Sequence, residues 1–75
     1  GGVEMPRGFK KYDFVKVVML TDEKEQARLI EAEGMIADVT ESEYPYEIFF
    51  FDKNFQKFSL KNGIYCWKDY QLEAI

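Results

Sequence analysis

The strongest constraint on how this chain folds is the stretch from Gly34 to Asp52, GMIADVTESEYPYEIFFFD. Its two halves, Met35 to Thr40 and Tyr46 to Phe51, are rich in β-branched and aromatic residues, and each has the length of a strand. Pro45 lacks a backbone N–H and holds the residue before it in an extended conformation, so strand pairing should stop there. The stretch therefore predicts a central β-hairpin that turns near Pro45.

Side chains along the second half of this hairpin should alternate between two faces of the sheet. One face carries Tyr46, Ile48 and Phe50, and the other carries Glu47, Phe49 and Phe51. Because Glu47 marks the face that meets water, Phe49 and Phe51 are predicted to lie outside the core. Two exposed aromatic side chains exceed what solubility requires, which indicates a binding surface.

The rest of the chain predicts three more strands, Tyr12–Thr21, Lys57–Lys61 and Tyr70–Ile75. Asp22 to Glu33 is expected to form a short acidic helix or a long folded loop, with Asp22 as its cap and Glu25 completing a capping box. Gly34 then suits a helix C′ position or a strand entry with a positive φ.

Turn signals separate the later segments. Asp52 to Gln56 is expected to be a polar turn with Asn54 in the left-handed region, and Asn62-Gly63 a tight turn. Ile64 to Trp67 is expected to be either a single turn of tight helix or a brief extended piece. Together these segments describe five short strands with one long loop after the first.

Four segments carry a family resemblance: YDFVKV from Tyr12, GMIADV from Gly34, YEIFFFD from Tyr46 and LEAI from Leu72. They are similar to small bacterial SH3-like barrels, including KOW-type segments and a group of short domains of the same strand pattern. The resemblance covers nearly the whole chain and implies an all-β fold, a small five-stranded SH3-like barrel with one short helix or long loop. Members of this broad fold bind proline-rich peptides, ribosomal RNA, repressors or toxins, so the resemblance implies a fold and not an activity. The chain lacks the paired tryptophans of peptide-binding SH3 domains.

The length of 75 residues predicts one domain. Residues 1–8 are expected to be a flexible N-terminal segment in which Gly1-Gly2 is not native, and residues 9–75 to form the domain. The single Cys66 excludes an internal disulfide and favours a cytoplasmic protein. No apolar run reaches the roughly 20 residues of a membrane span, so no membrane association is expected.

Charge is unevenly distributed along the chain. The formal net charge is −4, but residues 18–52 alone carry ten acidic and two basic residues, a net charge of −8. The segments on either side each have a net charge of +2. An acidic block repels nucleic acid and attracts basic proteins, which favours a basic protein partner. The alternative is that these acids are solvated loop residues.

Signals for catalysis or metal binding are missing from the sequence. It has no histidine, and Cys66 has no partner at zinc-ligand spacing. Glu41 and Glu43 lie in a turn with no apolar pocket that would shift a carboxyl pKa toward acid–base work. We therefore expect no enzyme activity, no cofactor and no metal.

The remaining candidate is a partner-binding surface of aromatic and acidic side chains. Its predicted members are Glu41, Glu43, Tyr44, Glu47, Phe49, Phe51 and Trp67. For Trp67 the alternative is a core position beside Tyr65 that closes one end of the barrel.

Two functional hypotheses follow. The first is a non-catalytic protein-binding module, an acidic inhibitor or regulator of the antitoxin, immunity or antirepressor type, with weak self-association through a sheet edge. The alternative is a nucleic-acid- or ribosome-associated KOW-like module that uses the basic ends of the chain. Those basic residues are Arg7, Lys10, Lys11, Lys16, Lys57, Lys61 and Lys68. A structural piece of a larger assembly is a third possibility.

Overall fold

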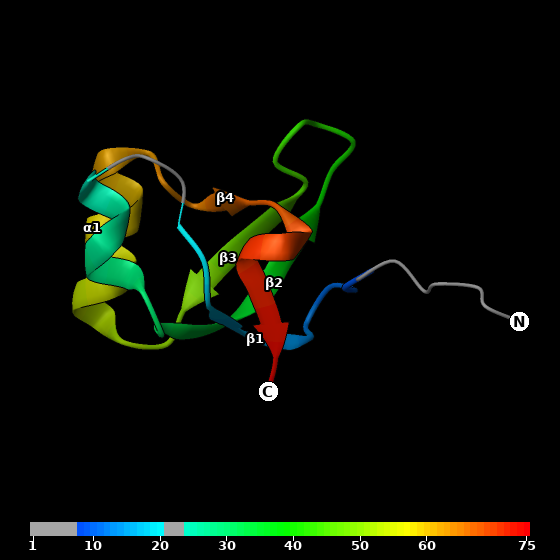
Figure 1. Cartoon of the computed structure of the whole chain (residues 1–75), viewed down its shortest axis with the longest axis horizontal. Helices are drawn as coiled ribbons and strands as arrows, with labels where there is room; N and C mark the ends of the chain where they lie inside the picture. Colours follow the sequence, from blue (N-terminus) through cyan, green and yellow to red (C-terminus); the bar gives the residue numbers. More distant parts are fainter. Residues whose placement is uncertain (1–7, 21–23) are drawn as a thin grey trace, which may run out of the picture.

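The computed structural model describes residues 8–20 and 24–75, and a five-stranded antiparallel sheet dominates them (Figure 1). The strand order is β4-β3-β2-β1-β5. The strands are β1 (Phe14–Val17), β2 (Glu33–Val39), β3 (Tyr46–Phe50), β4 (Cys66–Trp67) and β5 (Leu72–Ala74). The helical elements are η1 (Lys24–Leu29) and η2 (Asp69–Gln71), both 3₁₀, and α1 (Lys53–Asn62). The mostly β fold with five strands and one short helix is confirmed.

The central hairpin is formed by β2 and β3, as the sequence predicts. Met35 pairs with Phe49 and Val39 with Tyr46, with a shift of register between Ile36 and Asp38. The backbone N–H of Thr40 donates to the carbonyl of Pro45 at 2.8 Å, which closes the connecting loop. The hairpin therefore turns over residues 40–45.

One face of the sheet covers the core. The alternation predicted for β3 holds, because Tyr46, Ile48 and Phe50 are buried while Phe49 is exposed. The rings of Phe50 and Trp67 meet edge to face, with centroids 6.2 Å apart. Within the described ranges, the buried apolar residues are Val15, Val17, Leu29, Ala32, Ile36, Tyr46, Ile48, Phe50, Ile64, Trp67 and Leu72.

The sheet does not close into a complete barrel. Among the described strands, β4 pairs with β3 and β5 pairs with β1, and no ladder joins β4 to β5. Lys68 and η2 are all that separates these two edge strands along the chain. The short η2 turn carries the chain from one edge of the sheet to the other, so the closure expected for a barrel is left incomplete.

Helix α1 replaces the strand predicted at Lys57–Lys61, and that prediction is wrong. Asp52 caps the helix, its carboxylate accepting from the N–H groups of Asn54 and Phe55, so residues 52–56 are not the polar turn expected. Gly63 ends it with a φ of 68°. Phe55 and Phe58, three residues apart, pack against the core from one face of the helix.

Other boundaries also differ from the predictions. The first and last strands are shorter than expected, and η2 occupies part of the predicted Tyr70–Ile75 strand. Ile64 to Trp67 takes the extended alternative. The acidic segment is a 3₁₀ helix, and its predicted cap Asp22 lies outside the described residues.

Gly34 does not have the positive φ that was expected. The left-handed residue at this point of the chain is Glu31, with a φ of 67°. Gly34 is needed for a close approach instead, because a Cβ there would lie 3.0 Å from Ile48 Cγ2 and closer still to the carbonyl oxygen of Phe49.

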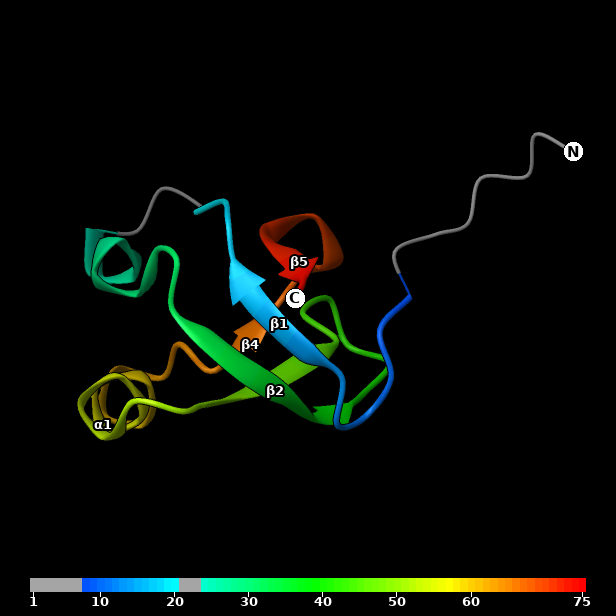
Figure 2. The ribbon, with the colours of Figure 1, turned by 90° about the horizontal axis from the view of Figure 1, so that it is seen from below.

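Helix α1 and η1 lie together at one end of the sheet, away from the hairpin loop (Figure 2). The guanidinium of Arg28 lies over the ring of Phe58 at 4.6 Å and joins the two elements. Within the described ranges, no helix has the length and apolar character to cross a membrane.

Candidate functional site

Aromatic side chains gather on the outer face of the sheet. Phe14, Phe49 and Phe51 are 54%, 42% and 46% exposed. The ring centroid of Phe51 lies 5.4 Å from that of Phe14 and 6.5 Å from that of Phe49. Met35 lies between Phe14 and Phe49 in register. We call these four residues the outer patch.

The outer patch follows from strand alternation. Val15 and Val17 fill the core, so Phe14 must point the other way, and the same reasoning holds for Phe49 between Ile48 and Phe50. The sequence prediction that Phe49 and Phe51 lie outside the core is confirmed. Edge-to-face ring pairs hold the aromatic residues together although each side chain remains about half exposed to solvent.

A hollow of about 220 Å³ opens between β3 and α1, next to the outer patch. Its lining combines aromatic surface with two lysines and one amide: Phe49, Phe50, Phe51, Lys53, Gln56 and Lys57. Gln56 is fixed, because its Oε1 accepts from the N–H of Phe50 at 2.8 Å. We call this feature the lysine hollow.

Helix α1 carries positive charge and no acidic residue. Lys53, Lys57 and Lys61 are spaced by four residues, so they follow one side of the helix with a rise of roughly 6 Å between neighbours. In the part of the chain that the structure describes, none of the three makes an ion pair. Their charges are therefore available to a ligand.

The opposite end of the hairpin is acidic. Glu41, Glu43 and Tyr44 are exposed in the loop, as the sequence predicts. The hydroxyls of Thr40 and Ser42 are 2.9 Å apart, and that of Ser42 donates to the carbonyl of Tyr44 at 3.0 Å. These bonds order the loop and hold its carboxylates out in solvent.

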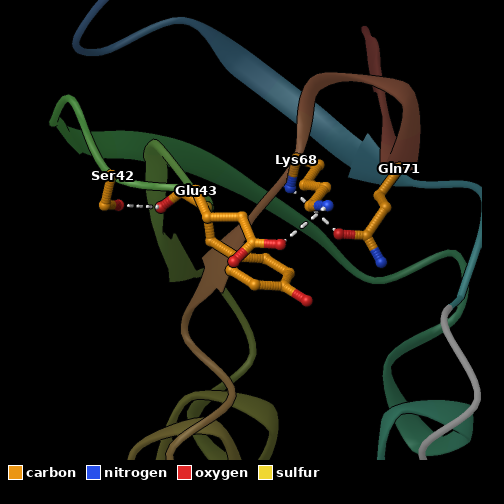
Figure 3. A network of polar contacts seen from close by, with 5 residues as sticks. Ser42, Glu43, Lys68 and Gln71 are labelled. Carbon is orange, nitrogen blue, oxygen red and sulfur yellow. Dashed lines mark hydrogen bonds and ion pairs between the residues drawn. The ribbon is translucent and has the colours of Figure 1, made fainter.

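Lys68 ties the acidic loop to η2 (Figure 3). Its Nζ lies 3.5 Å from Glu43 Oε2 and 4.9 Å from the centre of the Tyr44 ring. Its backbone N–H donates to Oε1 of Gln71 at 2.9 Å. Although partial burial lowers the pKa of Lys68, the nearby Tyr70 and Glu43 outweigh it, so that the pKa is raised.

Two carboxylates face each other on the strands that lead into this loop. Asp38 of β2 is the register partner of Glu47 of β3, and like charges directly opposite one another repel. Glu47 also pairs with Cys66 of β4. Burial, and after it the charge of Glu47, raises the pKa of the Cys66 thiol, which disfavours the reactive thiolate.

The structure divides the predicted partner-binding residues among four places. Glu41, Glu43 and Tyr44 lie in the loop, while Phe49 and Phe51 lie near the other end of the hairpin, with Glu47 between. Trp67 does not belong to the surface at all, because it is completely buried. Strand β4 turns it inward opposite Tyr46, so the core alternative is the correct one.

Several surface residues were missed from sequence. Phe14 and Met35 complete the outer patch, and alternation around Val15 and Ile36 was sufficient signal to find them. Lys53 was missed, and Lys57 was predicted to be basic surface but not to lie beside it, because α1 was interpreted as a turn and a strand, which separates their side chains.

Metal binding has no candidate site in the described ranges. Among those residues, no group of three or more acidic or cysteine side chains is placed to hold a metal ion. Comparison of the chain with family models, curated proteins and solved structures gives no match. What the chain does must be argued from its own residues.

Proposed function

We propose that this chain is a non-catalytic protein-binding module that inhibits or regulates a basic partner protein, in the manner of an antitoxin, immunity factor or antirepressor. The observation that carries the proposal is the outer patch. Three phenylalanines remain about half exposed although the fold has a core that takes other aromatics completely. Exposed aromatic residues in contact with one another are typical of interface anchors.

Charge supports a basic partner. Around the hairpin loop the acidic residues are Asp38, Glu41, Glu43 and Glu47, and Lys68 is the only cation that the structure places in ion-pair contact with any of them within its described residues. An excess of carboxylates beside exposed aromatic surface attracts a positively charged protein and speeds its association. We place this module in the cytoplasm because it has a single, unpaired cysteine.

The topology supports an SH3-like relationship as part of the proposal. The order β4-β3-β2-β1-β5, with a 3₁₀ turn between β4 and β5, is compatible with a small SH3-like sheet left partly open. Such a fold serves many functions, so the assignment of protein binding rests on the surface and not on the topology.

Affinity capture from a native cell extract tests the proposal. We expect one basic protein to bind the wild-type chain and to be lost with the double variant Phe49→Ser, Phe51→Ser. Glu41→Lys combined with Glu43→Lys should also lose it, while circular dichroism shows that both variants remain folded. Leu60→Ser is the matched control, because Leu60 is an exposed apolar residue outside the patch and the hollow. Capture that is unchanged in the aromatic variant would refute the proposal.

The second candidate is nucleic-acid binding, and the lysine row on α1 favours it. Lys57 and Lys61 were predicted members of a basic surface, and Lys53 joins them on the same side of the helix, next to the aromatic rings of the hollow. Cationic and aromatic side chains together are the usual combination for single strands. Lys68 is excluded from this surface because it lies by the acidic loop.

Fluorescence anisotropy with labelled single-stranded DNA and RNA separates the two candidates. Nucleic-acid binding predicts affinity that falls steeply with added salt, because bound counterions are released. It also predicts loss of binding in Lys53→Glu, Lys57→Glu. No change of anisotropy at low ionic strength would exclude this candidate.

A further inference from the structure

The two ends of the β2–β3 hairpin carry complementary chemistry. Figure 1 shows the loop of residues 40–45 at one end and α1 at the other. The loop end presents the carboxylates of Glu41 and Glu43 with the ring of Tyr44. The lysine hollow at the α1 end presents Lys53 and Lys57 with aromatic surface. The lysines and aromatic surface at the α1 end are therefore suited to bind the carboxylates and the tyrosine ring that the loop end presents.

The lysine hollow selects for an acidic segment that includes an aromatic residue. Its charged lining residues are both lysines, and in the described part of the chain neither is neutralised by an ion pair. The rings of Phe49 and Phe51 provide apolar surface for an inserted side chain. An aromatic side chain in contact with them, with carboxylates at the two lysines, would satisfy both parts of the lining.

The acidic loop has the matching composition. Glu41 and Glu43 are exposed, and the sequence between Thr40 and Pro45 places Tyr44 next to them. Lys68 covers the Tyr44 ring only in part and leaves the residue 37% exposed. Hydrogen bonds within the loop already fix its shape, so that little conformational entropy is lost when it docks.

We propose that the hairpin loop of one copy of this chain docks in the lysine hollow of a second copy. Both contacts form at once when two hairpins lie antiparallel about a two-fold axis, because each hairpin has the loop at one end and the hollow at the other. The outer patch lies at the α1 end of each hairpin, where Phe49 and Phe51 also line the hollow, so the loop of the second copy then lies against it. The pairing gives the exposed phenylalanines an occupant of defined chemistry.

This self-association does not depend on the proposed function, although the two use overlapping residues. A copy whose loop and outer patch are covered by a second copy cannot present them to a basic partner. Partner capture should therefore decrease as the concentration of the chain rises. Failure of capture would leave the dimer intact, and a monomeric chain could still capture its partner, so the two proposals fail separately.

Charge reversal on each side tests the pairing by sedimentation velocity over a range of concentrations. Lys53→Glu with Lys57→Glu, and separately Glu41→Lys with Glu43→Lys, should each raise the dissociation constant of the dimer at least about tenfold, because like charges then meet. An equimolar mixture of the two variants should associate again, because each supplies the charge that the other needs. Added salt is less decisive, since it screens both the lysine–glutamate contacts and the repulsion between two acidic molecules.

A charge-matched variant outside the hollow serves as the control for the reversal at the two lysines. Lys10→Glu with Lys11→Glu gives the same net charge as the hollow variant but lies outside the hollow, so this protein should dimerise like the wild type. A wild-type chain that is monomeric up to about 1 mM would overturn the proposal, and so would a dimer whose dissociation constant is unchanged by either reversal. Loss of the dimer in both variants without recovery in the mixture would overturn it as well.

Discussion

At the scale of single residues, Trp67 shows how an aromatic side chain can be assigned wrongly from composition. It is an attractive interface residue in the sequence, but β4 turns it into the core, where it meets Phe50. Its indole Nε1–H is buried and has no hydrogen-bond partner among the residues that the structure describes. The side chain therefore stabilises the fold by packing, while its polar atom opposes burial.

Because the ring of Trp67 stabilises the core while its buried N–H opposes burial, two substitutions at this position should lower the free energy of unfolding by different amounts. Trp67→Ala should lower the free energy of unfolding by about 3–5 kcal/mol, enough to unfold a domain of this size. Trp67→Phe should cost only about 1–2 kcal/mol, because it keeps an aromatic ring and removes the unpaired donor. Urea denaturation followed by far-ultraviolet circular dichroism measures both. A loss in Trp67→Phe well above its expected range would contradict the view that the indole N–H opposes burial.

Cys66 is a second residue whose environment predicts its behaviour. Since burial and the charge of Glu47 raise the pKa of its thiol, the folded protein holds the thiol proton more tightly than the unfolded chain does. The stability that results is complete below the ordinary thiol pKa and is lost as the pH rises through the higher folded value. Alkylation of folded Cys66 by iodoacetamide at pH 8 should consequently be slower than that of the urea-unfolded chain.

Glu47→Gln separates the charge effect from burial. Removing one directly opposed charge, a contribution of about 0.5–1 kcal/mol, should lower the thiol pKa and accelerate alkylation roughly two- to fivefold. Glu73→Gln, on the exposed part of β5, is the control and should leave the rate unchanged. A rate that is the same in Glu47→Gln and wild type would mean that burial alone protects the thiol.

At the scale of elements, the sequence correctly predicted the features that depend on the alternation of side chains along a strand. The hairpin of β2 and β3, and the outward direction of Phe49, follow from a period of two around Glu47, and the structure agrees. The same criterion failed at Lys57–Lys61. Phe58 and Leu60 flank Ser59 as a strand would require, yet Phe55 and Phe58 also fit a helix, and a short segment cannot separate the two periods.

The end signals at this helix were equally ambiguous. Asp52 fits a turn as well as an N-cap, and Asn62-Gly63 fits a hairpin turn as well as a C-cap with positive φ. The lysine hollow could not be predicted because it exists only where α1 packs against β3. The outer patch depends only on the alternation of side chains along strands, so it could be predicted from the sequence.

Two glycines in these elements are required for different reasons, which a pair of substitutions can distinguish. Gly63→Ala should cost about 1–2 kcal/mol, because the backbone is left-handed while the space around it is open. Gly34→Ala should cost more, about 3 kcal/mol, because a Cβ meets the backbone of β3 and the strands must separate. Thermal unfolding of both variants measures the difference. A smaller loss at Gly34 than at Gly63 would contradict the close approach of β2 and β3.

At the scale of the whole molecule, charge and aromatic surface are arranged along the hairpin. The sequence shows an acidic middle between two basic segments, but only the fold brings the basic segment 53–62 beside Phe49 and Phe51 and sends the loop to the far end. The net charge of −4 therefore combines regions of opposite sign, among them an acidic pole at the hairpin loop and a basic pole at α1. An average of this kind describes solubility, whereas the poles decide which surfaces can meet.

Association through these poles should make the stability of the chain depend on its concentration. If two copies pair only when folded, each tenfold rise in concentration above the dissociation constant stabilises the dimer by up to about 1.4 kcal/mol, so the urea midpoint should move upward. Lys53→Glu with Lys57→Glu should keep a constant midpoint up to concentrations at least about tenfold higher than the wild-type chain does, while Lys10→Glu with Lys11→Glu should keep the wild-type dependence. Because a midpoint at fixed concentration also reflects helix propensity and repulsion within α1, the informative quantity is its slope with concentration. A flat slope for the wild-type chain at concentrations where sedimentation detects a dimer would mean that the paired surfaces do not require the folded hairpin and α1.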